Sequence, residues 1–161
     1  LFVRLMPSRL FTKVRNRGGL SVDVSSPEGI SLRVFNLHLI LAHPTWRLQE
    51  FERAMLKRER TRSSIVCGDF NILEKLHITP LNFILGGRVS DAFLYTRERT
   101  HIERRFVEYE LLNALSGKIT HRLSRSQLDH ILVSRSFSIK SAAVLPDRLG
   151  SDHHPIRVEI E

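Results

Sequence analysis

The chain has 161 residues, 42% of them hydrophobic, and its 25 basic and 17 acidic residues leave a net charge of +8. This length predicts one domain that can bury a sizeable core. Arg or Lys interrupts every apolar segment before it reaches the roughly 20 residues of a membrane span, which argues against a transmembrane protein. The single cysteine, Cys67, excludes an intrachain disulfide and a cysteine-based zinc site.

The amino end lacks the apolar core of a signal peptide, which favours a cytoplasmic location. The first residue is Leu1 rather than Met, so we expect the chain to begin within a domain. An alternative start codon or processing would explain Leu1 equally well. We treat residues 1–161 as one domain whose amino-terminal part is missing.

Two strands are predicted first, Leu20–Val24 and Ile30–Leu41, and the turn-rich segment 25–29 between them indicates a hairpin. Side chains alternate along the second strand, so Asn36 and His38 share one face. The opposite face is apolar and comprises Phe35, Leu37, Leu39 and Leu41.

An amphipathic helix is expected next, from Trp46 to about Arg60, because apolar residues recur there at helical spacing. A short apolar run, Ser64–Cys67, follows it and is typical of a strand buried on both faces. This strand opens directly into the polar sequence Gly-Asp-Phe-Asn at residues 68–71.

The second half alternates predicted helices and strands. Two helices are expected at Leu81–Leu85 and Thr96–Ser116, and three strands at Val89–Phe93, Gln127–Ser134 and Ile156–Ile160. The chain has no internal repeat and no linker, so we interpret it as one mixed α/β unit.

Polar, titratable residues follow several apolar strands, where a sheet opens to ligands. Asp69 and Asn71 present a carboxylate and an amide on the same side, which suits binding of a water and an anionic oxygen, although a simple turn has the same pattern. Asp129 enters a buried strand, where an isolated carboxylate needs a partner. His38 is either a structural histidine or a phosphate ligand.

Asp152 and His153 combine a ligand for a hard cation with an imidazole that titrates near neutral pH. This combination suits metal-assisted acid–base chemistry, whereas a polar loop before a strand is the alternative interpretation.

The ordered segments FNLHL, IVCGDFN, SDAF, QLDHILVS and SDHHP together resemble the endonuclease/exonuclease/phosphatase superfamily. The resemblance runs from about Leu20 to the carboxyl end. It implies a four-layer α/β/β/α sandwich that here lacks its amino-terminal strands. It also implies cleavage of phosphate esters with Mg²⁺ (or Mn²⁺) by in-line attack of an activated water.

The resemblance also implies roles for individual side chains. Asp69 matches the aspartate that orients or deprotonates the water, and Asn71 and His38 match residues that contact the phosphoryl group. Asp152 matches the carboxylate near the metal.

The remaining two matches form a pair. His153 resembles the general acid/base or phosphate-contacting histidine, and Asp129 the aspartate that fixes the tautomer of that histidine.

The amino-terminal half of the family pattern, including its metal-binding glutamate, has no match in this chain. Glu28 lies in a Pro/Gly turn and is not a convincing replacement. We therefore expect that an upstream polypeptide or an oligomer partner would be needed to complete the domain.

Charge favours a nuclease that acts on DNA or RNA, because nucleic acid is a polyanion and one region is rich in basic residues. These are Arg97, Arg99, Arg104, Arg105, Lys118, Arg122 and Arg125. The alternatives are a phosphatase or sphingomyelinase-like phospholipid phosphodiesterase, and an inactive fragment that lacks the metal-binding glutamate.

Overall fold

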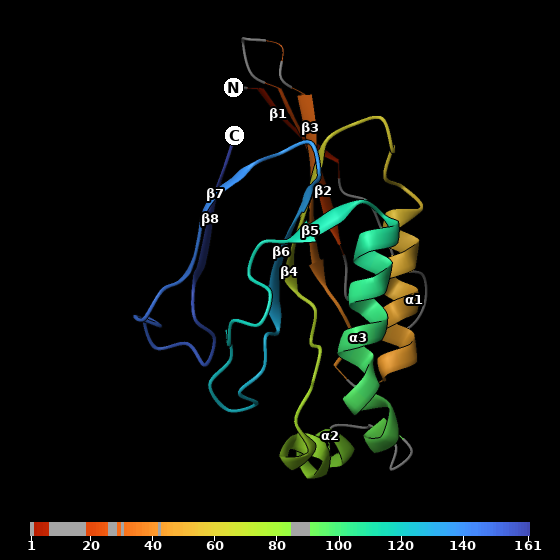
Figure 1. Cartoon of the computed structure of the whole chain (residues 1–161), viewed down its shortest axis with the longest axis vertical. Helices are drawn as coiled ribbons and strands as arrows, with labels where there is room; N and C mark the ends of the chain where they lie inside the picture. The colour runs from red at the N-terminus through yellow and green to blue at the C-terminus, as the bar shows by residue number, and fades with distance from the viewer. Residues whose placement is uncertain (1, 7–18, 26–28, 30, 42, 85–90) are drawn as a thin grey trace.

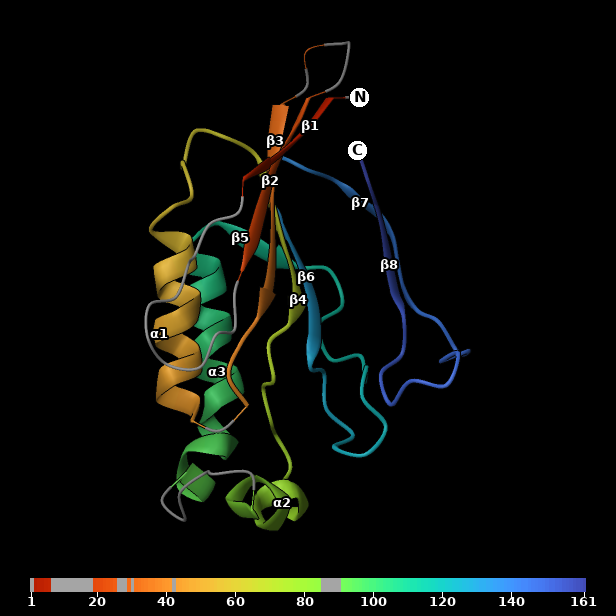
Figure 2. The same ribbon diagram turned by 180° about the vertical axis from the view of Figure 1, so that it is seen from behind.

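The structure is a computed structural model, and it describes residues 2–6, 19–25, 29, 31–41, 43–84 and 91–161. A six-stranded sheet in the order β1-β2-β3-β4-β6-β5 forms its centre. Helices α1 and α3 cover one face of this sheet, and a two-stranded sheet, β7-β8, lies on the other side (Figures 1 and 2). This arrangement confirms the predicted α/β class.

The strands and helices have the following bounds. The six-stranded sheet contains β1 (Phe2–Met6), β2 (Leu20–Ser25), β3 (Ser31–His38), β4 (Ser64–Asp69), β5 (Leu111–Asn113) and β6 (Asp129–Ser134). The remaining elements are α1 (Pro44–Met55), the short 3-10 helix η1 (Leu76–Ile78), α2 (Thr79–Ile84), α3 (Ala92–Glu108), β7 (Ile139–Val144) and β8 (Ile156–Ile160). None of the helices described is long and apolar enough to cross a membrane.

The main core lies between the sheet and the two helices. Phe51 on α1 and Phe106 on α3 meet edge to face with ring centroids 5.3 Å apart, and both pack against the fully buried Phe70, which follows β4. The apolar face predicted for the second strand supplies the sheet side of this core, since Phe35 and Leu37 are buried while Asn36 and His38 are exposed.

Close approach of β3 and β4 depends on a glycine. Gly68 has φ +125°, and a Cβ atom there would lie 2.0 Å from the carbonyl oxygen of Leu37. Only glycine fits this position, so the parallel β3–β4 pairing continues to the ends of both strands at His38 and Asp69.

Several predicted boundaries are wrong. The helix expected to reach Arg60 ends at Met55. Leu56 is 82% exposed, and Arg58, beyond the helix end, donates to the carbonyl oxygen of Tyr109. The strand predicted at Val89–Phe93 is not formed by its described residues, since α3 already begins at Ala92. The helix predicted to reach Ser116 ends at Glu108.

Helix α3 cannot continue through Glu110, because this residue has φ +56°. Residues 111–113 then pair with β6 at the edge of the sheet. Two further strands, β1 and β7, were not predicted, and Leu85, the predicted end of the short helix, lies outside the described residues.

Candidate active site

Strands β3 and β4 end, and β6 begins, at the lower end of the sheet in Figure 1, and a titratable residue stands at each of these positions. His38 ends β3, Asp69 ends β4 and Asp129 begins β6. Asp69 is the register partner of His38 on one side and of Asp129 on the other. Neighbouring strands lie about 4.8 Å apart, so these three side chains are necessarily adjacent.

The turn after β4 is fixed by its own side chains. The backbone N–H of Asn71 donates to Asp69 Oδ1 at 2.9 Å, and the Asn71 amide donates to the carbonyl oxygen of Leu39 at 2.9 Å. Asn71 has φ +53°, a conformation that asparagine tolerates better than most residues. These two bonds fix Asp69 and Asn71 next to the fully buried Phe70.

Asp129 and His153 form a hydrogen-bonded pair. His153 Nδ1 lies 2.8 Å from Asp129 Oδ2, and because a carboxylate only accepts, this bond places a proton on Nδ1 and leaves Nε2 available. Burial lowers the pKa of His153, but the hydrogen bond and charge of Asp129, with the charge of Asp69, outweigh it and raise the pKa overall. The pair therefore favours the imidazolium form.

Burial raises the pKa of Asp69, and the nearby charge of Asp129 raises it further. The hydrogen bond from the Asn71 backbone opposes this shift. Asp69 Oδ2 lies 3.7 Å from Nε2 of His38, whose side chain is 58% exposed and so accessible to a ligand. A carboxylate with a raised pKa accepts a proton more readily, which suits a base.

A residue that sequence reasoning missed, His121, completes this group. His121 Nε2 lies 3.3 Å from Asp152 Oδ2, and its ring centroid lies 4.7 Å from that of His153. Backbone contacts hold the two segments together, including a bond from His154 N to the carbonyl oxygen of Thr120 at 2.7 Å. The only available signal was that His121 shortly precedes the LDHI segment.

These residues fit a divalent cation. His121, Asp152 and His153 offer ligand atoms within 4.8 Å of one another, and the hydrogen bond from His121 lowers the pKa of Asp152, which keeps its carboxylate ionised. Mg²⁺ is commonly held by one or two carboxylates plus waters. Asp152 would therefore hold such an ion. Glu28, which the sequence analysis considered as a replacement for the metal-binding glutamate, lies outside the described residues.

A cleft of about 230 Å³ opens beside this group. Asn71, Asp152 and His153 contribute polar groups, and Leu73 and Leu128 belong to its apolar wall. The cleft therefore brings together candidate phosphate, metal and proton-transfer groups from three separate parts of the chain.

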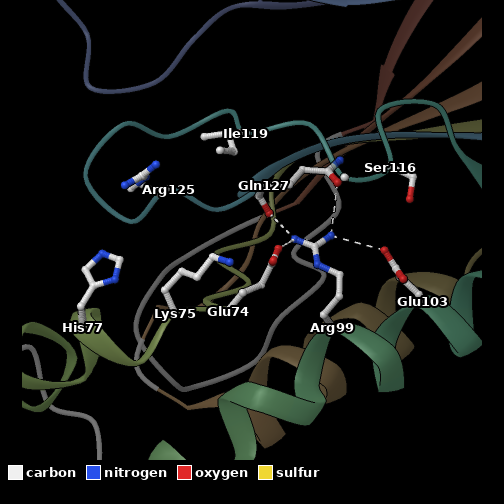
Figure 3. A pocket seen from close by; sticks show the side chains of 10 residues that line it. Glu74, Lys75, His77, Arg99, Glu103, Ser116, Ile119, Arg125 and Gln127 are labelled. Atoms are coloured by element: carbon white, nitrogen blue, oxygen red, sulfur yellow. Dashed lines mark hydrogen bonds and ion pairs between the residues drawn. The ribbon is translucent and has the colours of Figure 1, made fainter.

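A larger cavity of about 660 Å³ lies between α3, residues 74–77 and the loop before β6. Figure 3 shows Arg99 at its centre, between Glu74 and Glu103. Arg99 also donates to the carbonyl oxygen of Gln127 at 2.8 Å. The guanidinium thus joins α3 to the segment after β4, through Glu74, and to the segment before β6, through Gln127.

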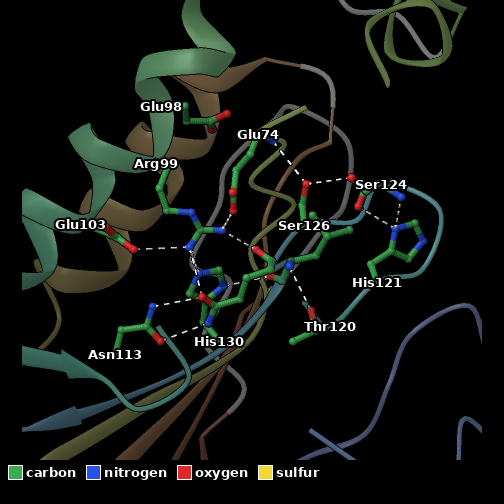
Figure 4. A network of polar contacts seen from close by, with 12 residues as sticks. Glu74, Glu98, Arg99, Glu103, Asn113, Thr120, His121, Ser124, Ser126 and His130 are labelled. Atoms are coloured by element: carbon green, nitrogen blue, oxygen red, sulfur yellow. Dashed lines mark hydrogen bonds and ion pairs between the residues drawn. The ribbon is translucent and has the colours of Figure 1, made fainter. Parts of the chain in front are cut away.

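The same network fixes His130, as Figure 4 shows. Its Nδ1 lies 3.0 Å from the carbonyl oxygen of Leu128, so Nδ1 carries the proton, and its Nε2 lies 3.1 Å from Arg99 Nη1. Complete burial, together with the charge of Arg99, lowers the pKa of His130 to about 3. His130 is therefore a neutral structural residue.

Two arginines of the basic region predicted to attract a polyanion form ion pairs with glutamates of the same chain. Arg99 pairs with Glu74, and Arg105 pairs with Glu52. Four of its arginines remain exposed: Arg97, Arg104, Arg122 and Arg125.

Comparison with known proteins was decisive for the family. The model of the Endonuclease/Exonuclease/phosphatase family matches residues 5–153. The chain belongs to this family. Members of the family are hydrolases that act on phosphate esters. No curated protein sequence matches the chain significantly.

Solved structures support the same fold. The inositol polyphosphate 5-phosphatase domain of SPsynaptojanin, in complex with inositol (1,4)-bisphosphate and calcium, has a TM-score of 0.67 at 17% identity over 98% of this chain and 53% of that one. An endonuclease/exonuclease/phosphatase from Beutenbergia cavernae has a TM-score of 0.63 at 19% identity over 99% of this chain and 43% of that one.

D. rerio TDP2 complexed with single-strand DNA product has a TM-score of 0.57 at 15% identity, over 100% of this chain and 67% of that one. The chain thus spans about half the length of the first two structures and two thirds of the third. These likenesses show the fold. Two of the three structures hold different molecules, an inositol bisphosphate in one and a single-strand DNA product in the other.

Proposed function

We propose that this chain forms the catalytic part of a metal-dependent phosphodiester hydrolase whose substrate is DNA or RNA. The observation that carries this proposal is the hydrogen-bonded pair of Asp129 and His153 next to Asp69. The proposal is supported by three features at one end of the sheet: the His153 imidazole with its raised pKa, the Asp69 carboxylate as a candidate base, and the cleft of about 230 Å³.

In the proposed reaction, Asp69 orients the attacking water and accepts its proton as the new phosphorus–oxygen bond forms. The bond from phosphorus to the leaving-group oxygen breaks, and that oxygen takes a proton from solvent. His153, protonated on both nitrogens, donates a hydrogen bond from Nε2 to the phosphoryl group as negative charge develops there. Asn71 and His38 contact the other phosphoryl oxygens. A divalent cation held by Asp152 would supply further positive charge to the same group.

Nucleic acid is supported by charge. The net charge is +8, and the exposed arginines Arg122 and Arg125 belong to the loop that also contributes His121 to the site. Binding of phosphates to such side chains releases counterions and raises affinity.

A phosphate monoester is the second candidate. Arg99 and Arg105 are paired internally, which reduces the charge available to a long polyanion, and the cleft beside His153 is only about 230 Å³. The resemblance to an inositol polyphosphate phosphatase domain supports the same alternative.

The test compares hydrolysis of plasmid DNA, an RNA oligonucleotide, bis-p-nitrophenyl phosphate, inositol bisphosphate and sphingomyelin vesicles, with Mg²⁺ or Mn²⁺ and with EDTA. We expect metal-dependent cleavage of DNA or RNA that His153→Gln lowers by at least about a hundredfold.

The matched control is His154→Gln, since in the described part of the chain the His154 side chain bonds the backbone carbonyl oxygen of Leu145 and should tolerate the change. Preference for inositol bisphosphate would select the monoester candidate, and preference for sphingomyelin the lipid one. Complete inactivity of a folded sample would favour the inactive fragment and contradict the proposal.

A further inference from the structure

A small cavity of about 170 Å³ lies at the end of the sheet opposite the candidate active site. It sits beside Ser64, which begins β4, and Ser134, which ends β6, whereas Asp69 and Asp129 occupy the other ends of the same strands. Five residue steps along a strand separate the two ends by about 17 Å. The cavity, here called the arginine cavity, is lined by Arg58, Arg60, Thr61, Arg62, Ser63, Glu110, Ser134, Arg135 and Ser136.

Arg58 is held rigidly at this cavity. Its Nε donates to Ser64 Oγ at 2.5 Å and its Nη1 to the carbonyl oxygen of Tyr109 at 2.7 Å, while Nη2 donates to Ser134 Oγ at 3.2 Å. All three acceptors are uncharged. Burial lowers the pKa of Arg58 and the charge of Arg60 lowers it further, whereas the charge of Glu110 opposes the shift.

Arg60 and Arg135 bring further positive charge to the arginine cavity, and neither forms an ion pair in the described part of the chain. The ion pairs among the described residues include none with Arg58, Arg60 or Arg135. Arg62 pairs through Nη1 with Asp23, but its buried Nε has no hydrogen-bond partner in the described part of the chain. Glu110 is the one carboxylate in the lining, against four guanidinium groups.

We propose that the arginine cavity binds a single phosphate group, either inorganic phosphate or the monoester end of a small molecule. Guanidinium groups match phosphate oxygens in pairs. The Ser63 and Ser136 hydroxyls lie 2.9 Å apart in a hydrogen bond that uses one of their two protons, so the other proton can be donated to a phosphate oxygen. The volume is below that of pockets for drug-sized ligands, which favours a single group. The cavity contains no residue assigned to hydrolysis, so this proposal stands apart from the proposed function.

The test is calorimetric titration of the protein with inorganic phosphate in EDTA. We expect the double variant Arg60→Gln/Arg135→Gln to weaken phosphate binding at least about tenfold, because each substitution removes charge-assisted hydrogen bonds from a guanidinium group to the phosphate. The charge-matched control Lys140→Gln/Arg157→Gln changes exposed residues of β7 and β8, and it should stay within about twofold of the unmodified chain.

Two further measurements separate this cavity from the candidate active site. The ¹H–¹⁵N side-chain signals of Arg58 and Arg62 should shift during the titration, and these shifts should be the same in His153→Gln. Equal weakening in both double variants, or loss of these shifts in His153→Gln, would overturn the proposal. Melting curves establish that each variant is folded.

A competition arm identifies the source of the phosphate group. Displacement of bound phosphate by a 5′-phosphorylated dinucleotide, but not by its unphosphorylated form, would assign a monoester end, and no displacement by either would assign free phosphate. Equal displacement by both would indicate a non-selective polyanion surface and contradict the proposal.

Discussion

Asp129 Oδ2 and His153 Nδ1 lie 2.8 Å apart although the two residues are 24 positions apart in the chain. The carboxylate fixes the tautomer of the imidazole and raises its pKa. This hydrogen bond thereby joins two distant segments, a loop and the start of a strand, at the candidate active site.

Replacing Asp129 by Asn should lower the pKa of His153, because the amide removes the charge that stabilises the imidazolium. The alkaline limb of the rate–pH profile should move to lower pH, and kcat should fall by about a hundredfold to ten-thousandfold. The pKa can be followed through the C2–H resonance of His153. An unchanged pKa and rate would show that the contact has no functional role.

Gly68→Ala should destabilise the chain severely. The new Cβ would lie 2.0 Å from the Leu37 carbonyl oxygen in a backbone conformation with φ +125°, so we expect a loss of more than about 3 kcal/mol in urea unfolding. Gly117→Ala is the matched control, since Gly117 also has positive φ but no atom within 4 Å of its added Cβ. It should cost only about 1 kcal/mol, and equal losses would argue against the steric explanation.

His130 should make the fold sensitive to acid. Its pKa is lowered to about 3 in the folded chain from 6.5, so below about pH 6.5 the unfolded state binds the proton and the folded state does not. The free energy of unfolding should therefore fall by up to about 1.4 kcal/mol per pH unit from this group.

Urea unfolding between pH 4.5 and 7 measures this effect. His130→Gln should be less stable at neutral pH yet show a shallower decline on acidification, whereas His154→Gln should retain the full slope. Parallel pH curves for His130→Gln and the unmodified chain would contradict the buried neutral state.

Asp152→Asn should weaken the response to metal. We expect the Mg²⁺ concentration for half-maximal hydrolysis to rise at least about tenfold, because Asp152 supplies the oxygen ligand in its cluster with His121 and His153 and Mg²⁺ prefers oxygen ligands. Asp147→Asn tests the same loop without touching this cluster, since Asp147 bonds only the backbone N–H of Leu149. EDTA should abolish hydrolysis in every case, and an unshifted metal curve for Asp152→Asn would place the ion elsewhere.

Much of the candidate site was predictable because strand ends can be read locally. The apolar runs before Asp69 and after Asp129 indicated buried strands, and alternation placed His38 on the polar face of its strand. Once those strands pair, His38, Asp69 and Asp129 lie side by side at one end of the sheet. The roles assigned to these residues remain predictions that the variants above test.

The misjudged parts depend on contacts between distant residues. Glu110 adopts a positive φ and residues 111–113 pair with β6, which the helical spacing of the preceding residues could not reveal. His121 becomes relevant only because its loop lies against the segment containing Asp152. Arg99 looked like part of a substrate surface, but its guanidinium is held by Glu74 and Gln127.

The segment leaving β3 contains a natural reporter of global stability. The backbone N–H of Ile40 donates to Glu50 Oε2 at 2.7 Å in a buried position, and Arg47 binds the Ile40 carbonyl oxygen at 3.2 Å while its Nε donates to Glu98 on α3 at 2.6 Å. Solvent can reach this amide only when both helices separate from the strand. Its hydrogen–deuterium exchange rate should therefore follow complete unfolding of the chain, although it lies only two residues from His38.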